Sequence, residues 1–237
     1  MNHNFVFFHV GDDVSTPTML VDSIRWSNPD ATIIFCTDRV TPQVPGITSR
    51  VEIDGDRSLL MTYRLKAFAR CQTQGPSIYL DTDMLVIRPL DPFRMLGEGQ
   101  IALCHRSFNI SSAFNGNFRG LDFLEYDQKP LGVVYPYVAC CTVTRDPQIW
   151  QVLLDLLLQL DPKFHLWYGD QEAMKRYAAE HQDLITRLPE SVYGCLPEAR
   201  DHIASAAILH FKGARKPAMA HAHAQLRTQA RAHSHKD

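Results

Sequence analysis

The six cysteines of this 237-residue chain include no Cys-x-x-Cys pair. That spacing is typical of structural zinc sites, so a site of this kind is not expected. Four of the cysteines lie in apolar runs, where a free thiol behaves as a small hydrophobic group: Cys36, Cys104, Cys140 and Cys141. Free cysteines in apolar runs are typical of a protein from a reducing compartment.

The sequence also lacks a long hydrophobic run and a strong charge of either sign. The apolar segments at residues 5–10 and 153–160 are too short to cross a bilayer, and no basic segment precedes the first one as in a signal peptide. The formal net charge of −2 does not favour nucleic-acid binding. A cytoplasmic globular protein with a substantial core is therefore the expectation.

Apolar runs typical of strands alternate with helical patterns along most of the chain. Strands are predicted at residues 5–10, 31–38, 50–54, 77–86, 101–105 and 136–143, and helices from residue 15, at 59–70 and at 147–160. This order predicts an α/β nucleotide-binding fold, whose ligands bind beyond the carboxyl ends of the strands. Three predicted strand ends are acidic: Gly11-Asp12-Asp13, Thr37-Asp38 and Asp81-Thr82-Asp83.

The third of these strand ends carries two aspartates in an Asp-x-Asp arrangement. Asp81 and Asp83 are two residues apart, so their carboxylates are expected on one face of the chain. Two like charges so close favour a cation between them, and Mg²⁺ and Mn²⁺ prefer oxygen ligands that they share with phosphate. The alternative is a solvated turn at the end of a strand.

A second segment supplies what such a site needs. His210 ends another short apolar run, and Gly213, Arg215 and Lys216 follow it within one loop. Imidazole is a metal ligand, glycine lets backbone N–H groups approach a phosphate, and lysine neutralises it. The two segments together predict a cation on Asp81, Asp83 and His210, with a diphosphate beside it.

Residues 106–135 form a long irregular segment in which aromatic side chains alternate with amides. Long loops inside a compact domain are usually functional or mobile. Either the aromatics stack on sugar rings, or the loop buries them against the sheet. Both interpretations stay open. Asp170 likewise reads as a helix cap or as a functional residue.

Taken together, these segments resemble family 8 of the retaining glycosyltransferases. The matching motifs occur in the family's order: Arg64-Leu65-Lys66, Tyr79-Leu80-Asp81-Thr82-Asp83-Met84-Leu85-Val86, Gly169-Asp170-Gln171-Glu172, and His210-Phe211-Lys212-Gly213-Ala214-Arg215-Lys216-Pro217. Arg64 stands seventeen residues before Asp81, as the family requires. Four ordered matches are more specific than any one of them. The resemblance covers roughly residues 5–217 and implies a GT-A domain over residues 1–218, with a single mixed, mostly parallel sheet flanked by helices.

The resemblance also implies an activity: transfer of a hexose from a UDP-sugar to a hydroxyl acceptor, with retention at the anomeric carbon and with Mn²⁺ or Mg²⁺ as cofactor. The implied metal ligands are Asp81, Asp83 and His210. The implied donor-binding residues are Val10, Asp12, Asp13, Arg64, Lys66, Asp81, Gly213 and Lys216. Asp170 is expected to bind sugar hydroxyls and Gln171 to lie near the anomeric carbon.

The sequence departs from the family at two places. Tyr137-Val138-Ala139-Cys140-Cys141-Thr142 stands where the family has an Asn-Ala-Gly step, and Ala218 replaces a tryptophan. A pseudoenzyme that binds a nucleotide sugar without transferring it is therefore one alternative. An inverting transferase with Asp122, Glu125 or Asp127 as base is another. A nucleotidyltransferase is disfavoured, because the loop after the first strand is acidic.

Residues 219–237 hold histidines, arginines and few apolar side chains, and are expected to be a disordered tail. Enzymes of the secretory pathway with the resembled fold usually carry a membrane anchor. Since this sequence shows no such segment, the expected location is cytoplasmic. Contact with the inner face of a bacterial membrane is left open but not favoured, because the tail lacks the bulky apolar face of interfacial helices.

Overall fold

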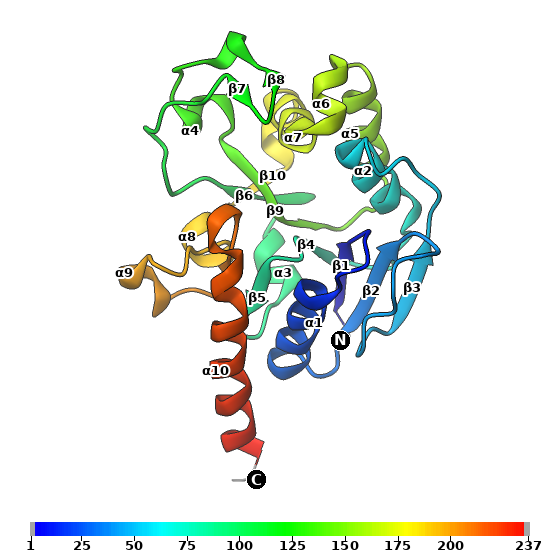
Figure 1. The fold of residues 1–237 in the computed structure, drawn as a ribbon, viewed down its shortest axis with the longest axis vertical. Helices are drawn as coiled ribbons and strands as arrows, with labels where there is room; N and C mark the ends of the chain where they lie inside the picture. The colour runs from blue at the N-terminus through cyan, green and yellow to red at the C-terminus, as the bar shows by residue number, and fades with distance from the viewer. Residues whose placement is uncertain (1–2, 235–237) are drawn as a thin grey trace.

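The computed structural model describes residues 3–234 and places a seven-stranded sheet at the centre of the molecule (Figure 1). In spatial order its strands are β10 (Ile185–Pro189), β6 (Ile101–His105), β9 (Tyr137–Thr144), β4 (Ser77–Leu80), β1 (Asn4–Phe8), β2 (Thr32–Thr37) and β3 (Ser49–Glu52). Strand β9 runs antiparallel to β4 and β6, and the other neighbouring pairs are parallel. The predicted mixed, mostly parallel sheet is confirmed.

Helices cover both faces of this sheet. One face carries α2 (Leu60–Arg70), α5 (Ile149–Leu158), α6 (Pro162–Leu166) and α7 (Gly169–Glu180), and the other carries α1 (Ser15–Ser27) and α3 (Pro92–Leu96). Successive side chains of β1 point alternately into the two hydrophobic cores. Val6 packs on the α2 side of the sheet, while Phe5 and Phe7 pack on the α1 side. All three side chains are fully buried.

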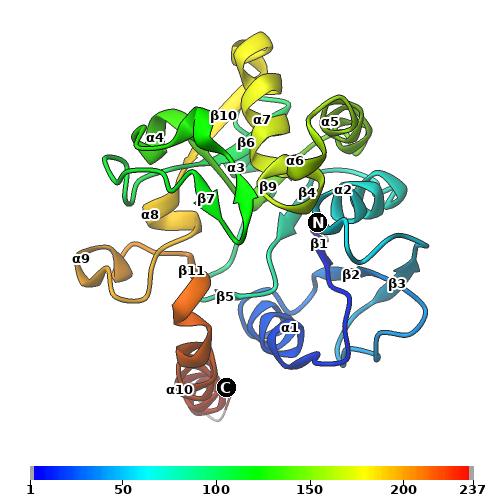
Figure 2. The same ribbon diagram turned by 45° about the horizontal axis from the view of Figure 1, so that its top comes forward.

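The predicted strand over residues 77–86 is interrupted at the two aspartates. Strand β4 ends at Leu80, and the chain turns through Asp81 and Thr82 before β5 (Met84–Val86). Strand β5 leaves the main sheet and pairs antiparallel with β11 (Ile208–His210), with His210 opposite Met84. This pairing brings the second predicted motif to the first, and Figure 2 shows β5 and β11 next to the start of the last helix.

The segment at residues 106–135 is ordered by its own aromatic side chains. It contains the hairpin β7 (Asn117–Phe118) and β8 (Leu121–Asp122), the 3₁₀ turn η1 (Leu124–Tyr126) and the short helix α4 (Leu131–Val134). Phe114 and Phe123 are almost fully buried and lie edge-on to each other and to neighbouring rings. Most of the segment therefore buries its aromatics, as one of the two interpretations expected.

The remaining elements, four short ones and the long helix α10, lie between α7 and the C-terminus. These are η2 (Gln182–Leu184), α8 (Glu190–Tyr193), α9 (Arg200–Ile203), η3 (Gly213–Arg215) and α10 (Lys216–Ser234). No helix in residues 3–234 is long and apolar enough to cross a bilayer. The six cysteines are all free and buried.

The prediction of a disordered tail from residue 219 is wrong for the part that the structure describes. Helix α10 is rich in alanine, the best helix former, and runs away from the sheet in Figure 1. Its first turns are held against α1: Met219 is fully buried, and His223 bonds Asp22 at 3.0 Å and stacks on Trp26. Residues 235–237 lie outside the described residues.

Candidate functional site

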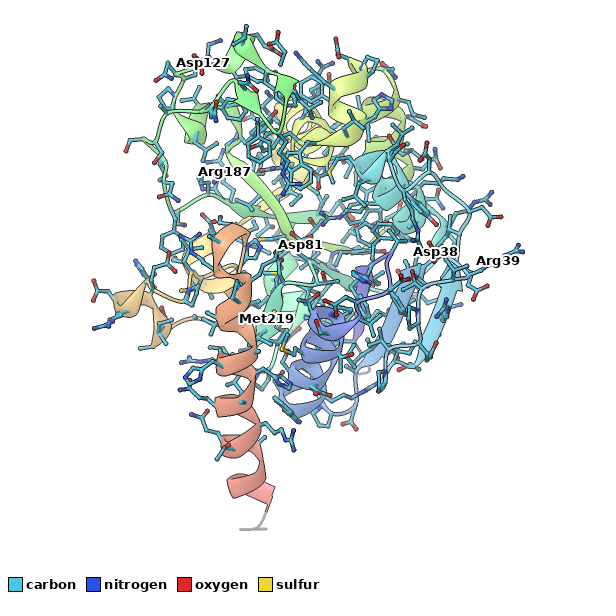
Figure 3. All side chains as sticks on the ribbon, in the orientation of Figure 1. Asp38, Arg39, Asp81, Asp127, Arg187 and Met219 are labelled. Carbon is cyan, nitrogen blue, oxygen red and sulfur yellow. The ribbon has the colours of Figure 1, made fainter. Side chains whose placement is uncertain are left out.

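A cavity of about 750 Å³ opens at the carboxyl edge of the sheet. Its walls come from the end of β1, helix α2, the turn after β4, strand β9, the β7–β8 hairpin, the start of α7 and the loop after β11. Asp81, labelled in Figure 3, lies centrally in the molecule, near the start of α10. The structure thus brings the four sequence motifs to one place.

Asp81, Asp83 and His210 converge in this cavity. Each can offer one ligand atom, and the three atoms lie within 4.8 Å of one another. His210 Nε2 is 3.3 Å from Asp83 Oδ1, and the buried His210 Nδ1 has no hydrogen-bond partner among the described residues. Two carboxylates and an imidazole that has one ring nitrogen without a partner are suitable ligands for a divalent cation such as Mn²⁺ or Mg²⁺.

Two cations flank the Asp-Asp-His group. Lys216 Nζ lies 3.3 Å from Asp83 Oδ2. On the other side, Arg64 Nη2 lies 2.7 Å from Asp81 Oδ1 and donates to the carbonyl of Ala139 at 2.7 Å, and Nη1 lies 3.0 Å from Asp170 Oδ2. Arg64 therefore ties the metal motif to the first turn of α7.

The electrostatics favour the charged forms of Asp83 and His210, whereas burial raises the pKa of Asp81 above its ordinary value. Burial alone would raise the pKa of Asp83, but His210 and Lys216 outweigh it and hold that pKa well below its ordinary value. Burial alone would lower the pKa of His210, but Cys140 and Asp83 outweigh it and raise the pKa to about 10. Without a metal, the group is thus an imidazolium against a carboxylate, and a metal that binds His210 must displace its proton.

This competition predicts a pH dependence for metal binding. Below pH 10 His210 is protonated, so the apparent affinity for Mn²⁺ is expected to fall about tenfold for each unit by which the pH falls. Calorimetric titration with Mn²⁺ at pH 7.5, in buffers of different ionisation enthalpy, should show about one proton released per cation. Binding without proton release, or an affinity that stays flat between pH 6.5 and 8.5, would contradict the assignment of His210.

The Asp170-Gln171 pair sits at the start of α7. Tyr168, with φ 62°, is the N-cap of this helix, so the alternative in which Asp170 caps it is wrong. A Cβ at Gly169 would lie 2.1 Å from the carbonyl oxygen of Phe164, so only glycine fits there. Asp170 is 4% exposed and pairs with Arg64, and both Asp170 and Gln171 line the cavity.

Arg106 reaches Gln171 from behind the cavity wall. It is 7% exposed, donates from Nε to the carbonyl of Tyr135 at 2.8 Å, and places Nη2 3.4 Å from Gln171 Oε1. Arg106 belongs to no motif of the sequence, because its partners come from distant segments. Its effect is to engage the oxygen of the Gln171 side chain.

The structure separates the remaining predicted residues into two groups. Val10, Gly213 and Lys216 line the cavity, whereas Asp12 and Asp13 do not and are exposed.

Lys66 also lies elsewhere: it bonds the carbonyl of Asp54 at 2.7 Å and lines a second cavity, of about 520 Å³, beside α5. Two residues along a helix turn the direction by about 200°, so Lys66 cannot share the face of Arg64. The motif Arg64-Leu65-Lys66 thus contributes only its arginine to the cavity around Asp81.

The three carboxylates considered as the base of an inverting enzyme do not line the cavity. Asp122 accepts from the backbone N–H of Leu124, Glu125 pairs with Lys163, and Asp127 accepts from the N–H of Gly116. Each thus has a structural partner within the irregular segment or on α6.

Several lining residues were not predicted from the sequence. His9, Trp167 and Arg119 all line the cavity, and His9 Nε2 is buried without a hydrogen-bond partner in the described structure. The aromatic-rich composition of residues 106–135 signalled this wall only in general terms.

Solved structures with a similar fold are glycosyltransferases. One is a glycosyltransferase involved in the glycosylation of the major capsid of PBCV-1: TM-score 0.59, 11% identity, and 92% of this chain aligned with 98% of that one. Another is the galactosyltransferase LgtC in complex with donor and acceptor sugar analogues: TM-score 0.55, 16% identity, 89% of this chain and 87% of that one. A third is GlyE of Streptococcus pneumoniae TIGR4, with 15% identity, TM-score 0.55, and 90% of this chain aligned with 55% of that one. No protein-family model and no curated protein sequence matches the chain. At these identities the likeness establishes the GT-A fold alone.

Proposed function

We propose that this protein is a metal-dependent glycosyltransferase that moves a hexose from a UDP-sugar to a hydroxyl acceptor, with retention of anomeric configuration. The observation that carries the proposal is the convergence of Asp81, Asp83 and His210 in a cavity that Lys216 also lines. The GT-A fold and the family 8 resemblance of the four motifs support it.

The donor's diphosphate is assigned to the loop after β11. Asp81, Asp83 and His210 would hold Mn²⁺ or Mg²⁺, which stabilises the negative charge that develops on a leaving nucleoside diphosphate. Lys216 supplies a second positive charge to the same phosphates. Gly213 has φ +65° and open space around its Cβ position, so its backbone can approach a phosphate closely.

The sugar is assigned to the side of the cavity where Asp170 and Gln171 lie. Asp170 would accept hydrogen bonds from sugar hydroxyls while its ion pair with Arg64 holds it in place. Gln171 is a poor nucleophile, because it is a primary amide and Arg106 engages its oxygen. Gln171 therefore fits the stabilisation of an oxocarbenium-like state, with the acceptor hydroxyl attacking on the face that the leaving phosphate vacates and passing its proton to that phosphate.

The sugar pocket differs from the family's at the Asn-Ala-Gly step. Val138 and Ala139 of β9 line the cavity there and offer no side-chain hydrogen bond to a sugar hydroxyl. The change favours a donor that does not need this contact, and it is also the observation behind the alternative of an inactive nucleotide-sugar-binding protein. The cytoplasmic location and any membrane contact stay predictions of the sequence.

Release of UDP separates the transferase from the inactive alternative. Incubation with a panel of UDP-hexoses and Mn²⁺ is expected to release UDP slowly from one of them, because water replaces the missing acceptor. EDTA should abolish the release. Binding of UDP and Mn²⁺ without turnover of any sugar, even when mixed glycans are added as acceptors, would favour the inactive protein, and no binding of either would overturn the proposal.

A further inference from the structure

The turn of the β7–β8 hairpin carries an arginine that lines the cavity beside two aromatic rings. Arg119 lies in the turn of the hairpin with φ 54°, a conformation uncommon for residues other than glycine. Its guanidinium carbon lies 4.1 Å from the centre of the Trp167 ring and 5.7 Å from that of Phe118. All three side chains line the same cavity as the Asp-Asp-His group.

Arg119 differs from the other cations of this cavity in having no carboxylate partner. The others are paired at 3.3 Å or less: Arg64 with Asp81 and Asp170, Lys212 with Glu190, Arg215 with Glu198, and Lys216 with Asp83. Among residues 3–234, no carboxylate oxygen lies within 4.0 Å of the Arg119 guanidinium. Arg119 is exposed, and its positive charge lies at the wall of the cavity without a neutralising group among the described residues.

Stacking leaves the hydrogen-bonding edge of a guanidinium free. The guanidinium carbon of Arg119 lies over the Trp167 ring, and guanidinium N–H groups that are not turned toward the ring can pair bidentately with a carboxylate or phosphate. Phe118 and Trp167 add apolar ring surface, on which the C–H face of a sugar packs. An arginine and aromatic rings at one wall match a sugar that carries an acidic substituent.

We propose that Arg119 and Trp167 form a subsite for a carboxylate or phosphate group of the acceptor glycan. The inference rests on the proposed transferase function, because only that function supplies an acceptor. The donor diphosphate has its own partners in the Asp-Asp-His group and Lys216. Arg119 comes from a segment separate from these partners, and the proposal assigns the acidic group a part of the cavity that the donor leaves free.

The test is the binding of matched acidic and neutral monosaccharides to the full chain without donor, in EDTA so that no metal binds the acid. Methyl glucuronide, methyl galacturonide and glucose 6-phosphate are titrated beside methyl glucoside and methyl galactoside, by ligand-observed NMR. At least one acid is expected to bind about tenfold more tightly than its neutral counterpart, the effect of one charge-assisted pair. Arg119→Gln should erase that preference. Arg94→Gln, which removes an exposed arginine of α3, should keep it.

Three results would overturn the proposal. They are equal binding of every acid and its neutral counterpart, a preference that survives Arg119→Gln, and a preference that disappears when UDP and Mn²⁺ are added. The last result would place the acid in the donor's part of the cavity. The arms without donor are independent of transfer, so a failure of the proposed function would appear in the UDP-release assay and not here.

Discussion

Replacing Asp83 with alanine is expected to lower the affinity for Mn²⁺ by at least about 100-fold, because even residues that only support a metal ligand are worth 10–100-fold. Asp83 contributes a carboxylate whose Oδ1 lies 3.3 Å from His210 Nε2 and whose Oδ2 lies 3.3 Å from Lys216 Nζ. Its removal takes one counter-charge from these two cationic side chains and leaves Asp81 as the one carboxylate of the Asp-Asp-His group. Metal-dependent binding of UDP should be lost with the metal, as measured by calorimetry with and without Mn²⁺.

A compensating effect decides the conditions of this experiment. Asp83 raises the pKa of His210, so its removal makes the imidazole easier to deprotonate and recovers part of the affinity at neutral pH. The comparison is therefore sharpest at pH 8.5. Asp30→Ala removes an equal charge from an exposed position outside the cavity and should bind Mn²⁺ as the unchanged protein does. An Asp83→Ala affinity within threefold of that control would contradict the metal site.

The order of strands and helices was predictable because buried parallel strands read as continuous apolar runs between helical patterns. The same continuity hid the turn at Asp81. Residues 77–80 and 84–86 are all buried, so nothing in the hydrophobic pattern marks where the chain leaves the main sheet for β5. Strand β10 was missed for the opposite reason: it is an edge strand with an exposed Arg187 and ends in proline.

The residues of the candidate site likewise divide into those that the sequence predicts and those that it does not. The sequence predicted the three metal ligands because each lies at or just after the end of an apolar run and because the combination of their side chains is typical of a metal site. These ligands are Asp81, Asp83 and His210. Arg119 and Arg106 were not predicted, since their role depends on which distant segments they meet. Lys66 shows the limit of motif matching: the motif is contiguous in sequence, but helical geometry sends its two cations to different cavities. Helix α10 was not predicted, because its sequence has few bulky apolar side chains and its docking depends on Met219 and His223 meeting the distant helix α1.

Replacing Arg64 with alanine is expected to have the opposite effect on metal binding from Asp83→Ala while destabilising the metal-free fold. Arg64 is 13% exposed in its side chain and holds Asp81, Asp170 and the carbonyl of Ala139. Its loss leaves the largely buried Asp170 without a counter-charge, and removing one partner of such a pair lowers the free energy of unfolding by about 3–5 kcal/mol. Arg57→Ala, at the more exposed pair with Asp38, should lower it by less than about 1 kcal/mol.

Mn²⁺ is expected to bind Arg64→Ala about tenfold more tightly than the unchanged protein, because a cation at Asp81 no longer meets the guanidinium. Mn²⁺ should then recover more unfolding free energy in this variant than in the unchanged protein, as linkage requires. Urea unfolding at several Mn²⁺ concentrations measures both quantities at once. If Arg64→Ala lost stability and metal affinity together, Arg64 would be acting only as a scaffold for the cavity. A loss of stability together with a gain in metal affinity would show that Arg64 balances part of the negative charge of Asp81 in the metal-free protein. The cation then balances that charge when it binds.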